Sequence, residues 1–309
     1  MDHQATQDIE ELFASHEPGP TWNEVTGIIR RISPEFDFST TQIVYDDITR
    51  LYRGEYPGYY QIKTPYHDLP HILDVLLCAV RLMHGAARSG NSLTDREMTL
   101  VMLAMLFHDT GYAQLLDGTE TGTGAQYTKM HVMRSIEFMR RYVADHKLSS
   151  DIATDLGPMI FCSEPMTPLS HINFPNERIR MLGQIVGTAD LVGQMADRNY
   201  LEKLTYLYEE FEEGDIGDYQ SLYELVCKTN EFYSSIKDKL DHEFGGIYNW
   251  LEFHFQDTLD TRENYYIESI EKNMAYLQKL VSLGEPDFRS HLRRGGIIRE
   301  KQQNPDSKN

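Results

Sequence analysis

Residues 98–112, M-T-L-V-M-L-A-M-L-F-H-D-T-G-Y, join a long apolar run to a histidine and an aspartate. The apolar run predicts a buried helix over 95–108, with Ser92 or Thr94 as its N-cap. His108 and Asp109 emerge side by side from the end of that helix. Burying both groups costs free energy unless a partner compensates them, and a divalent metal ion is the usual partner for this combination. The stretch therefore predicts a pair of metal ligands on a core helix.

The composition indicates a globular protein with a small-molecule partner. Of the 309 residues, 40% are hydrophobic, which suffices for a core. The net charge of −19 argues against a nucleic-acid duplex or an anionic membrane as the main partner. The negative charge of the protein would repel a phosphorylated substrate unless local cations compensate it, and bound metal ions would supply such cations. The composition leaves open whether the chain forms a homo-oligomer.

The cysteines and the apolar runs predict a soluble cytoplasmic protein. The three cysteines, Cys78, Cys162 and Cys227, are too few and too scattered for a disulfide framework. The first residues are acidic and polar, unlike a signal peptide. The longest strongly apolar run, 98–107, is too short to span a bilayer.

Apolar residues recur at three- and four-residue steps along most of the chain, and no run has a convincing strand pattern. The fold class predicted is therefore all-α. Pro18, Gly19 and Pro20 are expected to break an N-terminal helix, with Thr21 capping the next one. The expected helices cover 1–16, the stretch from Thr21, 40–53, 68–88, 95–108, 127–146, 149–162, 176–196, 197–213, 219–243, 247–257 and 261–282.

A second histidine motif precedes the helix at 68–88. His67 and His71 are four residues apart, but Pro70 requires the helix to begin near residue 69 or 70. His71 then lies in the first helical turn and His67 on the preceding loop, which suits one metal ligand and one proton donor. The alternative is that both are capping or surface histidines.

Asp190 lies inside the apolar stretch I-V-G-T-A-D-L-V-G-Q, residues 185–194. A carboxylate buried there must be paired, hydrogen-bonded or bound to a metal. Together with His71, His108 and Asp109 it makes a set of two histidines and two carboxylates. Such a set leaves coordination positions open to water, unlike a closed structural zinc site.

The order His, His-Asp, Asp resembles the HD-domain metal-dependent phosphohydrolases, an all-helical superfamily that includes cyclic-nucleotide phosphodiesterases. Y-H-D-L-P-H-I-L-D-V, residues 66–75, is similar to the phosphodiesterase pattern Y-H-N-x-x-H-x-x-D-V, with Asp68 in place of the usual Asn. The resemblance covers roughly residues 60–200. It implies that His67 donates a proton to the leaving oxygen, and that the metal ligands are His71, His108, Asp109 and Asp190.

The resemblance also implies a second metal ion in some members, with Asp109 as the bridge and a histidine from the next helix, here His131. A further histidine often follows, but here Cys162, Ser163 and Glu164 stand in that region and His171 lies beyond it. One or two divalent ions are therefore expected, and Mn, Mg, Fe, Co, Ni and Zn are not distinguished. After His108-Asp109 the sequence T-G-Y-A-Q departs from the phosphodiesterases, so specificity for cyclic nucleotides is not implied.

The cations nearest to these motifs are candidate phosphate-binding residues: Lys129, Arg134 and Arg198. Each is equally typical of a surface ion pair. The Gly/Thr-rich loop at 117–124 fits either a lid or a plain surface turn, because its glycines form no phosphate-binding signature.

These observations predict a single HD-domain helical bundle with additional helices at both ends. Its expected parts are N-terminal helices over 1–60, a catalytic core over 61–213, a C-terminal helical extension over 214–294 and a disordered tail over 295–309. The expected function is metal-dependent hydrolysis of a phosphoester of a nucleotide or related small molecule, with Asp68 and Asp74 helping to keep His67 protonated. The alternatives are a catalytically silent signalling or scaffold domain and a di-iron oxygenase.

Overall fold

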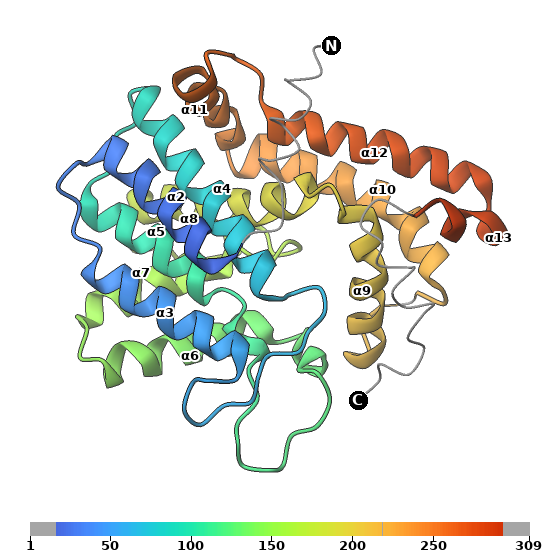
Figure 1. Cartoon of the computed structure of the whole chain (residues 1–309), viewed down its shortest axis with the longest axis horizontal. Coiled ribbons are helices and arrows are strands. Elements are labelled where there is room, and N and C mark those ends of the chain that lie inside the picture. Colours follow the sequence, from blue (N-terminus) through green and yellow to red (C-terminus); the bar gives the residue numbers. More distant parts are fainter. Residues whose placement is uncertain (1–16, 218, 293–309) are drawn as a thin grey trace.

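The computed structural model describes residues 17–217 and 219–292, and every regular element in them is a helix (Figure 1). An isolated bridge between Tyr59 and Leu115 is the only β-type pairing in this part of the chain. The predicted all-α class is therefore confirmed. The α-helices are α2 (Pro18–Ile32), α3 (Ser39–Arg53), α4 (Leu69–Arg88), α5 (Asp95–Phe107), α6 (His131–Asp145), α7 (Ser150–Phe161), α8 (Glu177–Ala196), α9 (Tyr200–Glu213), α10 (Leu222–Asp238), α11 (Trp250–Leu259), α12 (Tyr265–Leu283) and α13 (Glu285–Phe288).

The core is built around α4, α5 and α8. Helix α4 packs on α8, α2 and α11, while α5 packs on α3, α7 and α8. Nearly every residue of α4 from His71 to Ala86 is buried. It is also the one described helix long and apolar enough to cross a bilayer, but 83% of its apolar window is covered by protein. Its hydropathy is that of a helix enclosed by other helices.

The N-terminal boundary of α2 differs from the prediction. The helix begins at Pro18 instead of after Thr21, and Glu17 is its N-cap. Proline is tolerated in the first turn, because its missing N–H would have no intrahelical partner there. The Pro-Gly-Pro sequence therefore starts this helix, and Thr21 is buried within it.

Two side-chain caps fix the helix starts that matter for the site. Asp68 caps α4, its Oδ1 accepting a hydrogen bond from the His71 backbone N–H at 2.9 Å. This cap places His71 in the first turn and leaves His67 on the loop, as predicted. Thr94, one of the two expected caps, forms a reciprocal capping box with Glu97 at the start of α5.

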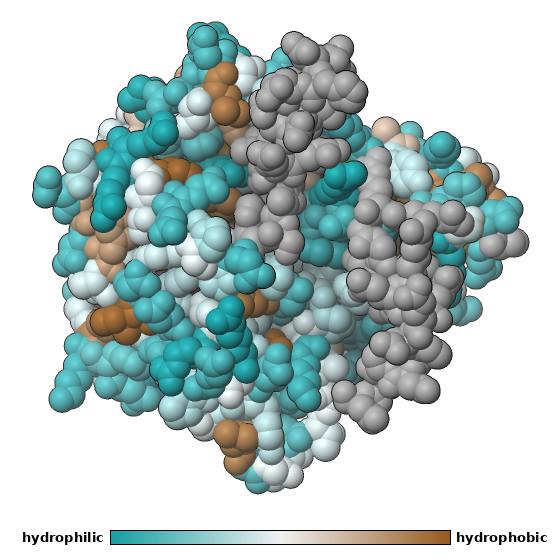
Figure 2. All heavy atoms as spheres, in the orientation of Figure 1, coloured by the Kyte–Doolittle hydropathy of each residue, from teal (hydrophilic) through white to brown (hydrophobic). Residues whose placement is uncertain are grey.

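The C-terminal helices partly share the core of the bundle. Helix α11 packs on α4 and α12 packs on α8, while α9 and α10 lie to one side (Figure 1). Helix α10 ends at Asp238 and a π-helical turn follows over Lys239–Glu243, so the helix predicted to run to 243 changes geometry near its end. The predicted helix at 1–16 and the predicted tail at 295–309 lie outside the described residues. On the face drawn in Figure 2, hydrophilic residues predominate and hydrophobic ones are scattered.

Candidate metal centre

The His108-Asp109 pair lies where α5 stops. His108 is the C-cap of α5, and a short 3₁₀ turn, Thr110–Tyr112, follows Asp109. The Thr110 hydroxyl donates to the Phe107 carbonyl at 2.8 Å, so this turn satisfies a backbone carbonyl at the end of the helix. Both His108 and Asp109 are buried. The end of a core helix thus carries two polar side chains into the interior.

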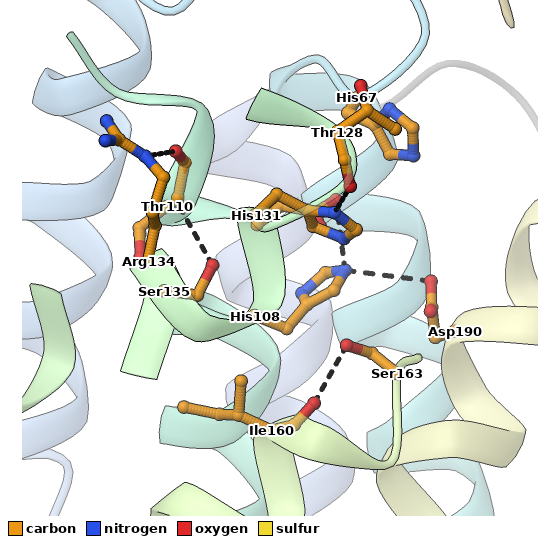
Figure 3. Close-up of polar contacts among 12 residues, drawn as sticks. His67, His108, Thr110, Thr128, His131, Arg134, Ser135, Ile160, Ser163 and Asp190 are labelled. Carbon is orange, nitrogen blue, oxygen red and sulfur yellow. Dashed lines mark hydrogen bonds and ion pairs between the residues drawn. The ribbon is translucent and has the colours of Figure 1, made fainter. Parts of the chain in front are cut away.

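A buried group of three side chains could hold a metal ion. His71 comes from the first turn of α4, His108 from the end of α5 and Asp190 from the middle of α8. One ligand atom from each lies within 4.8 Å of the others. His71 Nε2 lies 3.5 Å from Asp190 Oδ1. His108 Nε2 lies 3.6 Å from the same oxygen (Figure 3).

Asp109 lies between this group and a further histidine. Its Oδ2 is 3.3 Å from His71 Nε2 and 3.2 Å from His108 Nε2. Its Oδ1 is 3.6 Å from Nε2 of His131, the first residue of α6. The two oxygens of one carboxylate therefore face different histidines, which is the arrangement of a bridging ligand. The structure brings together all five residues expected to bind metal.

The hydrogen bonds of the ring Nδ1 atoms orient the Nε2 atoms toward the centre. His108 Nδ1 lies 2.7 Å from the Met105 carbonyl, and His131 Nδ1 lies 2.7 Å from the Thr128 carbonyl. A carbonyl can only accept, so each Nδ1 carries hydrogen and the neutral ring presents a lone pair at Nε2. His108 Nε2 and Asp109 Oδ2 are both buried and neither makes a hydrogen bond. Two acceptors that face each other require a proton or a metal ion between them.

The electrostatics of the group favour positive charge. Burial alone would lower the pKa of His71, but its contacts with Asp109 and Asp190 raise it to about 9. Burial alone would raise the pKa of Asp190, but His108 and His71 lower it to about 2. The pKa of His108 is raised well above its usual value by Asp109 and Asp190, against the effect of burial. Protons and a metal ion compete for such ligands, so binding a divalent ion would release protons.

Gly111 permits the close approach of α6 to the pair. A Cβ on Gly111 would lie 1.9 Å from the His131 carbonyl oxygen, and that contact is with backbone. The Gly111 N–H also donates to the Ser135 hydroxyl at 2.8 Å (Figure 3). A side chain at position 111 would therefore displace the first turn of α6, and His131 with it.

A carboxylate from α9 orients His67. Glu210 Oε2 lies 2.5 Å from His67 Nδ1, and its Oε1 accepts from the backbone N–H groups of Tyr66 and His67 at 2.6 and 3.2 Å. Burial alone would lower the pKa of His67, but Glu210 and then Asp109 raise it above the usual value. The carboxylates expected to keep His67 protonated were Asp68 and Asp74. This was wrong: Asp68 is occupied in capping α4, and the carboxylate against the ring is Glu210.

Tyr112 packs against two of the histidines. Its ring stacks on His67 and on His131, with centroids 4.8 Å apart in each case, and the two imidazole centroids lie 6.0 Å from each other. The Tyr112 ring is fully buried, so it restrains the positions of both imidazoles. The sequence predictions gave no role to Tyr112 or to Glu210. The signal for Tyr112 was its place directly after His-Asp-Thr-Gly, whereas Glu210 lies in an acidic run with nothing to distinguish it.

The site opens into a cavity of about 450 Å³ between the bundle and helices α9 and α10. His67, Asp109, His131 and Asp190 line one end of it. His71 and His108 are not among the lining residues, so they lie beneath this end. The volume is within the range of small-molecule sites.

The three predicted phosphate-binding cations differ in their placement. Lys129 lines the cavity, and its Nζ is 3.6 Å from Asp215 Oδ2. Arg134 donates to the carbonyls of Gly111 and Ala113, each at 2.7 Å, and is not among the lining residues. Arg198 is in the segment between α8 and α9, also outside the lining. The structure thus brings only Lys129 of this set to the cavity.

The region where a further histidine was expected contributes polar groups instead. Ser163 and Glu164 line the cavity. Burial lowers the pKa of His131, and the nearby Asp109 and Glu164 oppose this shift. Cys162 is buried, and burial raises the pKa of its thiol to about 12, as suits a core cysteine. His171 is exposed and does not line the cavity. The loop at 117–124 is tied to the end of α9, where the Thr123 hydroxyl donates to Glu213 at 2.9 Å.

Comparison with known proteins adds one family model. A family model described as Npun_R2479-like matches residues 113–239. The match contains His131, Asp190 and Glu210, and it begins after the His108-Asp109 pair. No curated protein matches the chain. Over less than half of its length, the chain is similar to the Npun_R2479-like family.

Proposed function

We propose that this protein is a metal-dependent hydrolase of small phosphoesters. The observation that carries the proposal is the pair of buried acceptors, His108 Nε2 and Asp109 Oδ2, which lie 3.2 Å apart without a hydrogen bond. Such a pair is costly unless a proton or a metal ion lies between the two atoms, and the ligand atoms of His71, His108 and Asp190 gathered there suit a metal ion. It stands at the end of a cavity that His67 also lines, so a cation site and a proton donor face the same space.

The residues present fit one or two divalent ions. His71, His108, Asp109 and Asp190 would hold the first. Asp109 and His131 would contribute to a second, and Glu164 supplies a further carboxylate on the same cavity wall. When bound, the metal would lower the pKa of a coordinated water and neutralise charge on the phosphoryl oxygens. Mixed nitrogen and oxygen ligands suit Mn, Fe, Co, Ni or Zn, and an all-oxygen preference makes Mg the weaker fit.

His67 acts as the general acid in this proposal. Glu210 holds Nδ1, so Nε2 is the ring nitrogen left for the substrate. A water oxygen forms the new bond to phosphorus, the bond to the leaving alcohol breaks, and His67 gives its Nε2 proton to the leaving oxygen. The proton lost by the attacking water passes to solvent, and solvent reprotonates His67 for the next cycle. Glu210 positions the ring and favours its charged form.

The proposal is tested with the purified full chain loaded with each of the six metals in turn. Metal content is measured per chain, together with hydrolysis of methyl p-nitrophenyl phosphate. We expect bound metal and turnover in at least one case, and loss of both in Asp109→Ala. A matched control is Asp155→Ala, a residue outside the cavity lining that is paired with Arg96. Full activity of Asp109→Ala, or absence of metal from the wild-type chain, contradicts the proposal.

The same experiment separates the competing functions. Stoichiometric metal without hydrolysis of any phosphoester would favour a silent binding or signalling domain. Oxygen uptake and an optical band that appear only with iron would favour a di-iron oxygenase. Neither alternative uses a proton donor held by a buried carboxylate, whereas hydrolysis of an ester with an alkoxide leaving group does.

A further inference from the structure

We propose that the substrate is a phosphoester of an apolar alcohol, carrying a single negative charge, and not a nucleotide. This inference rests on the proposed function and narrows its substrate. It comes from the half of the cavity that lies away from the metal ligands. There, α9 and α10 close the space against the bundle with an apolar wall, which includes Leu204, Leu207, Phe211, Leu225 and Phe232.

Three side chains of the apolar wall are partly solvent-accessible. Leu207, Phe211 and Phe232 are only partly buried although they pack against the core. Apolar side chains left partly exposed inside a cavity gain free energy when a ligand covers them. The wall therefore favours a ligand with a substantial hydrocarbon or aromatic group next to its phosphate.

The charges around the cavity disfavour a substrate with several phosphate charges. No arginine is among the lining residues. The two lining lysines already face carboxylates: Lys129 lies 3.6 Å from Asp215 and Lys228 lies 2.8 Å from Glu224. Asp109, Glu164 and Asp190 add negative charge to the lining. One bound divalent ion and protonated His67 together balance the charges of these three carboxylates, so little positive charge is left to offset a di- or triphosphate.

Several polar groups in the cavity already make hydrogen bonds, so a nucleotide base would find fewer donors. The hydroxyl hydrogens of Thr128, Ser163 and Thr229 each go to a backbone carbonyl, at 2.7 to 2.8 Å. Gln194 accepts from the Tyr66 hydroxyl at 2.8 Å, and its amide nitrogen lies 3.5 Å from Asp190. Burying the polar edge of a base without partners costs free energy. An alkyl or aryl group has no such requirement.

A binding series separates the substrate class from the reaction. Isothermal titration of the full chain, with its metal, uses dimethyl, diethyl, dipropyl and dibutyl phosphate, which all carry one charge. Each buried methylene should lower the Kd about fourfold. Adenosine monophosphate, which is more highly charged and carries a base, should bind more weakly than dibutyl phosphate. Hydrolysis of methyl p-nitrophenyl phosphate is followed in parallel.

Two variants and a control locate the effect. Leu207→Gln and Phe232→Ala should each flatten the dependence of Kd on alkyl length while leaving dimethyl phosphate binding nearly unchanged. If one of the two variants fails to fold, the other still tests whether the wall determines the dependence of Kd on alkyl length. Phe253→Ala, which removes an exposed phenylalanine on α11, should keep the wild-type series.

The outcomes distinguish the two proposals. A Kd that does not change with alkyl length overturns the apolar-substrate inference, even if methyl p-nitrophenyl phosphate is hydrolysed. Binding of adenosine monophosphate more tightly than dibutyl phosphate overturns it as well. A Kd that falls steeply with alkyl length in the wild type, and much less in both variants, supports the inference. A steep series without any hydrolysis overturns the proposed function but leaves the cavity as a site for apolar phosphoesters.

Discussion

Glu210 and His67 are separated by 143 positions in the chain, yet Oε2 of one lies 2.5 Å from Nδ1 of the other. Glu210 is buried and also accepts from the backbone N–H groups of Tyr66 and His67. One carboxylate from α9 thus fixes both the loop and the imidazole that it carries. This contact joins the C-terminal part of the molecule to the proposed proton donor.

Replacing Glu210 with Gln should lower kcat about ten- to hundredfold, because the acid loses the charge that favours its protonated form. Glu210 raises the pKa of His67 against the effect of burial, so the pKa should fall in the variant. The basic limb of the pH profile should therefore move to lower pH. The pH dependence of kcat/KM measures this shift, and the exposed neighbour change Glu209→Gln is the control. An unchanged profile would remove Glu210 from the mechanism.

Gly111→Ala should disturb the second metal position more than the first. The added Cβ would lie 1.9 Å from the His131 carbonyl oxygen, so α6 must shift. We expect a loss of about 1–3 kcal/mol in the free energy of unfolding, as in other overpacked sites. Metal content per chain should also fall. Gly27→Ala in α2 is the matched control, since a Cβ there meets nothing within 4 Å. Wild-type stability and metal content in Gly111→Ala would show that α6 adapts without loss.

Metal should stabilise the folded chain through Asp190. A ligand that binds only the folded state at a hundred times its Kd adds about 2.7 kcal/mol to the free energy of unfolding. Chelation should therefore lower the Tm, and readdition of the preferred metal should restore it. In Asp190→Asn the amide is a much weaker ligand, so the Tm should respond little to either treatment. Differential scanning calorimetry with and without chelator measures this, and an equal metal response in the variant would exclude Asp190 from the site.

The buried histidines His84 and His254 should make the fold sensitive to acid. Their Nδ1 atoms lie 3.0 Å apart, and burial together with the nearby Arg81 and His84 lowers the pKa of His254 to about 2. The folded state therefore stays unprotonated there, while the unfolded chain takes up a proton below about pH 6.5. The contribution of this group to stability is present above pH 6.5 and decreases as the pH falls toward 2, by up to about 1.4 kcal/mol per unit.

Urea unfolding at pH 7.5 and pH 5 should show this loss. His254→Asn cannot take up the proton, so its stability should change less between the two pH values. His242→Asn is the control, because that histidine is exposed on the π-helical turn. A pH dependence of His254→Asn equal to that of the wild type would place the acid sensitivity elsewhere.

Most of the helical fold could be predicted from local pattern. Helices α4 and α8 each have a periodic apolar pattern and a capping residue at the start. Both features involve residues that are close together in the sequence, so the sequence alone is enough to predict these helices. The boundary error at α2 has a local cause as well. Proline breaks a helix in its interior but is accepted in the first turn, and composition alone does not distinguish these two positions.

The candidate metal ligands could also be predicted from their neighbours in the sequence. His108, Asp109 and Asp190 are polar residues in apolar surroundings, where burial without a partner is costly. The substrate cations had no such signal, because an arginine on a helix surface looks the same whether it contacts a ligand or a backbone carbonyl. Arg134 proved to hold the turn after Asp109, by hydrogen bonds to two carbonyls.

The sequence by itself determined the helical class and the small set of polar side chains that must enter the core. It did so because both follow from periodicity and from the free energy of burying charge. Only the tertiary structure decided which carboxylate contacts His67, how closely α6 approaches Asp109, and what lines the rest of the cavity. Those relations join residues from different helices, and their distances depend on how whole helices pack. Glu210 in its acidic run and Gly111 after His-Asp acquire their roles only through that packing.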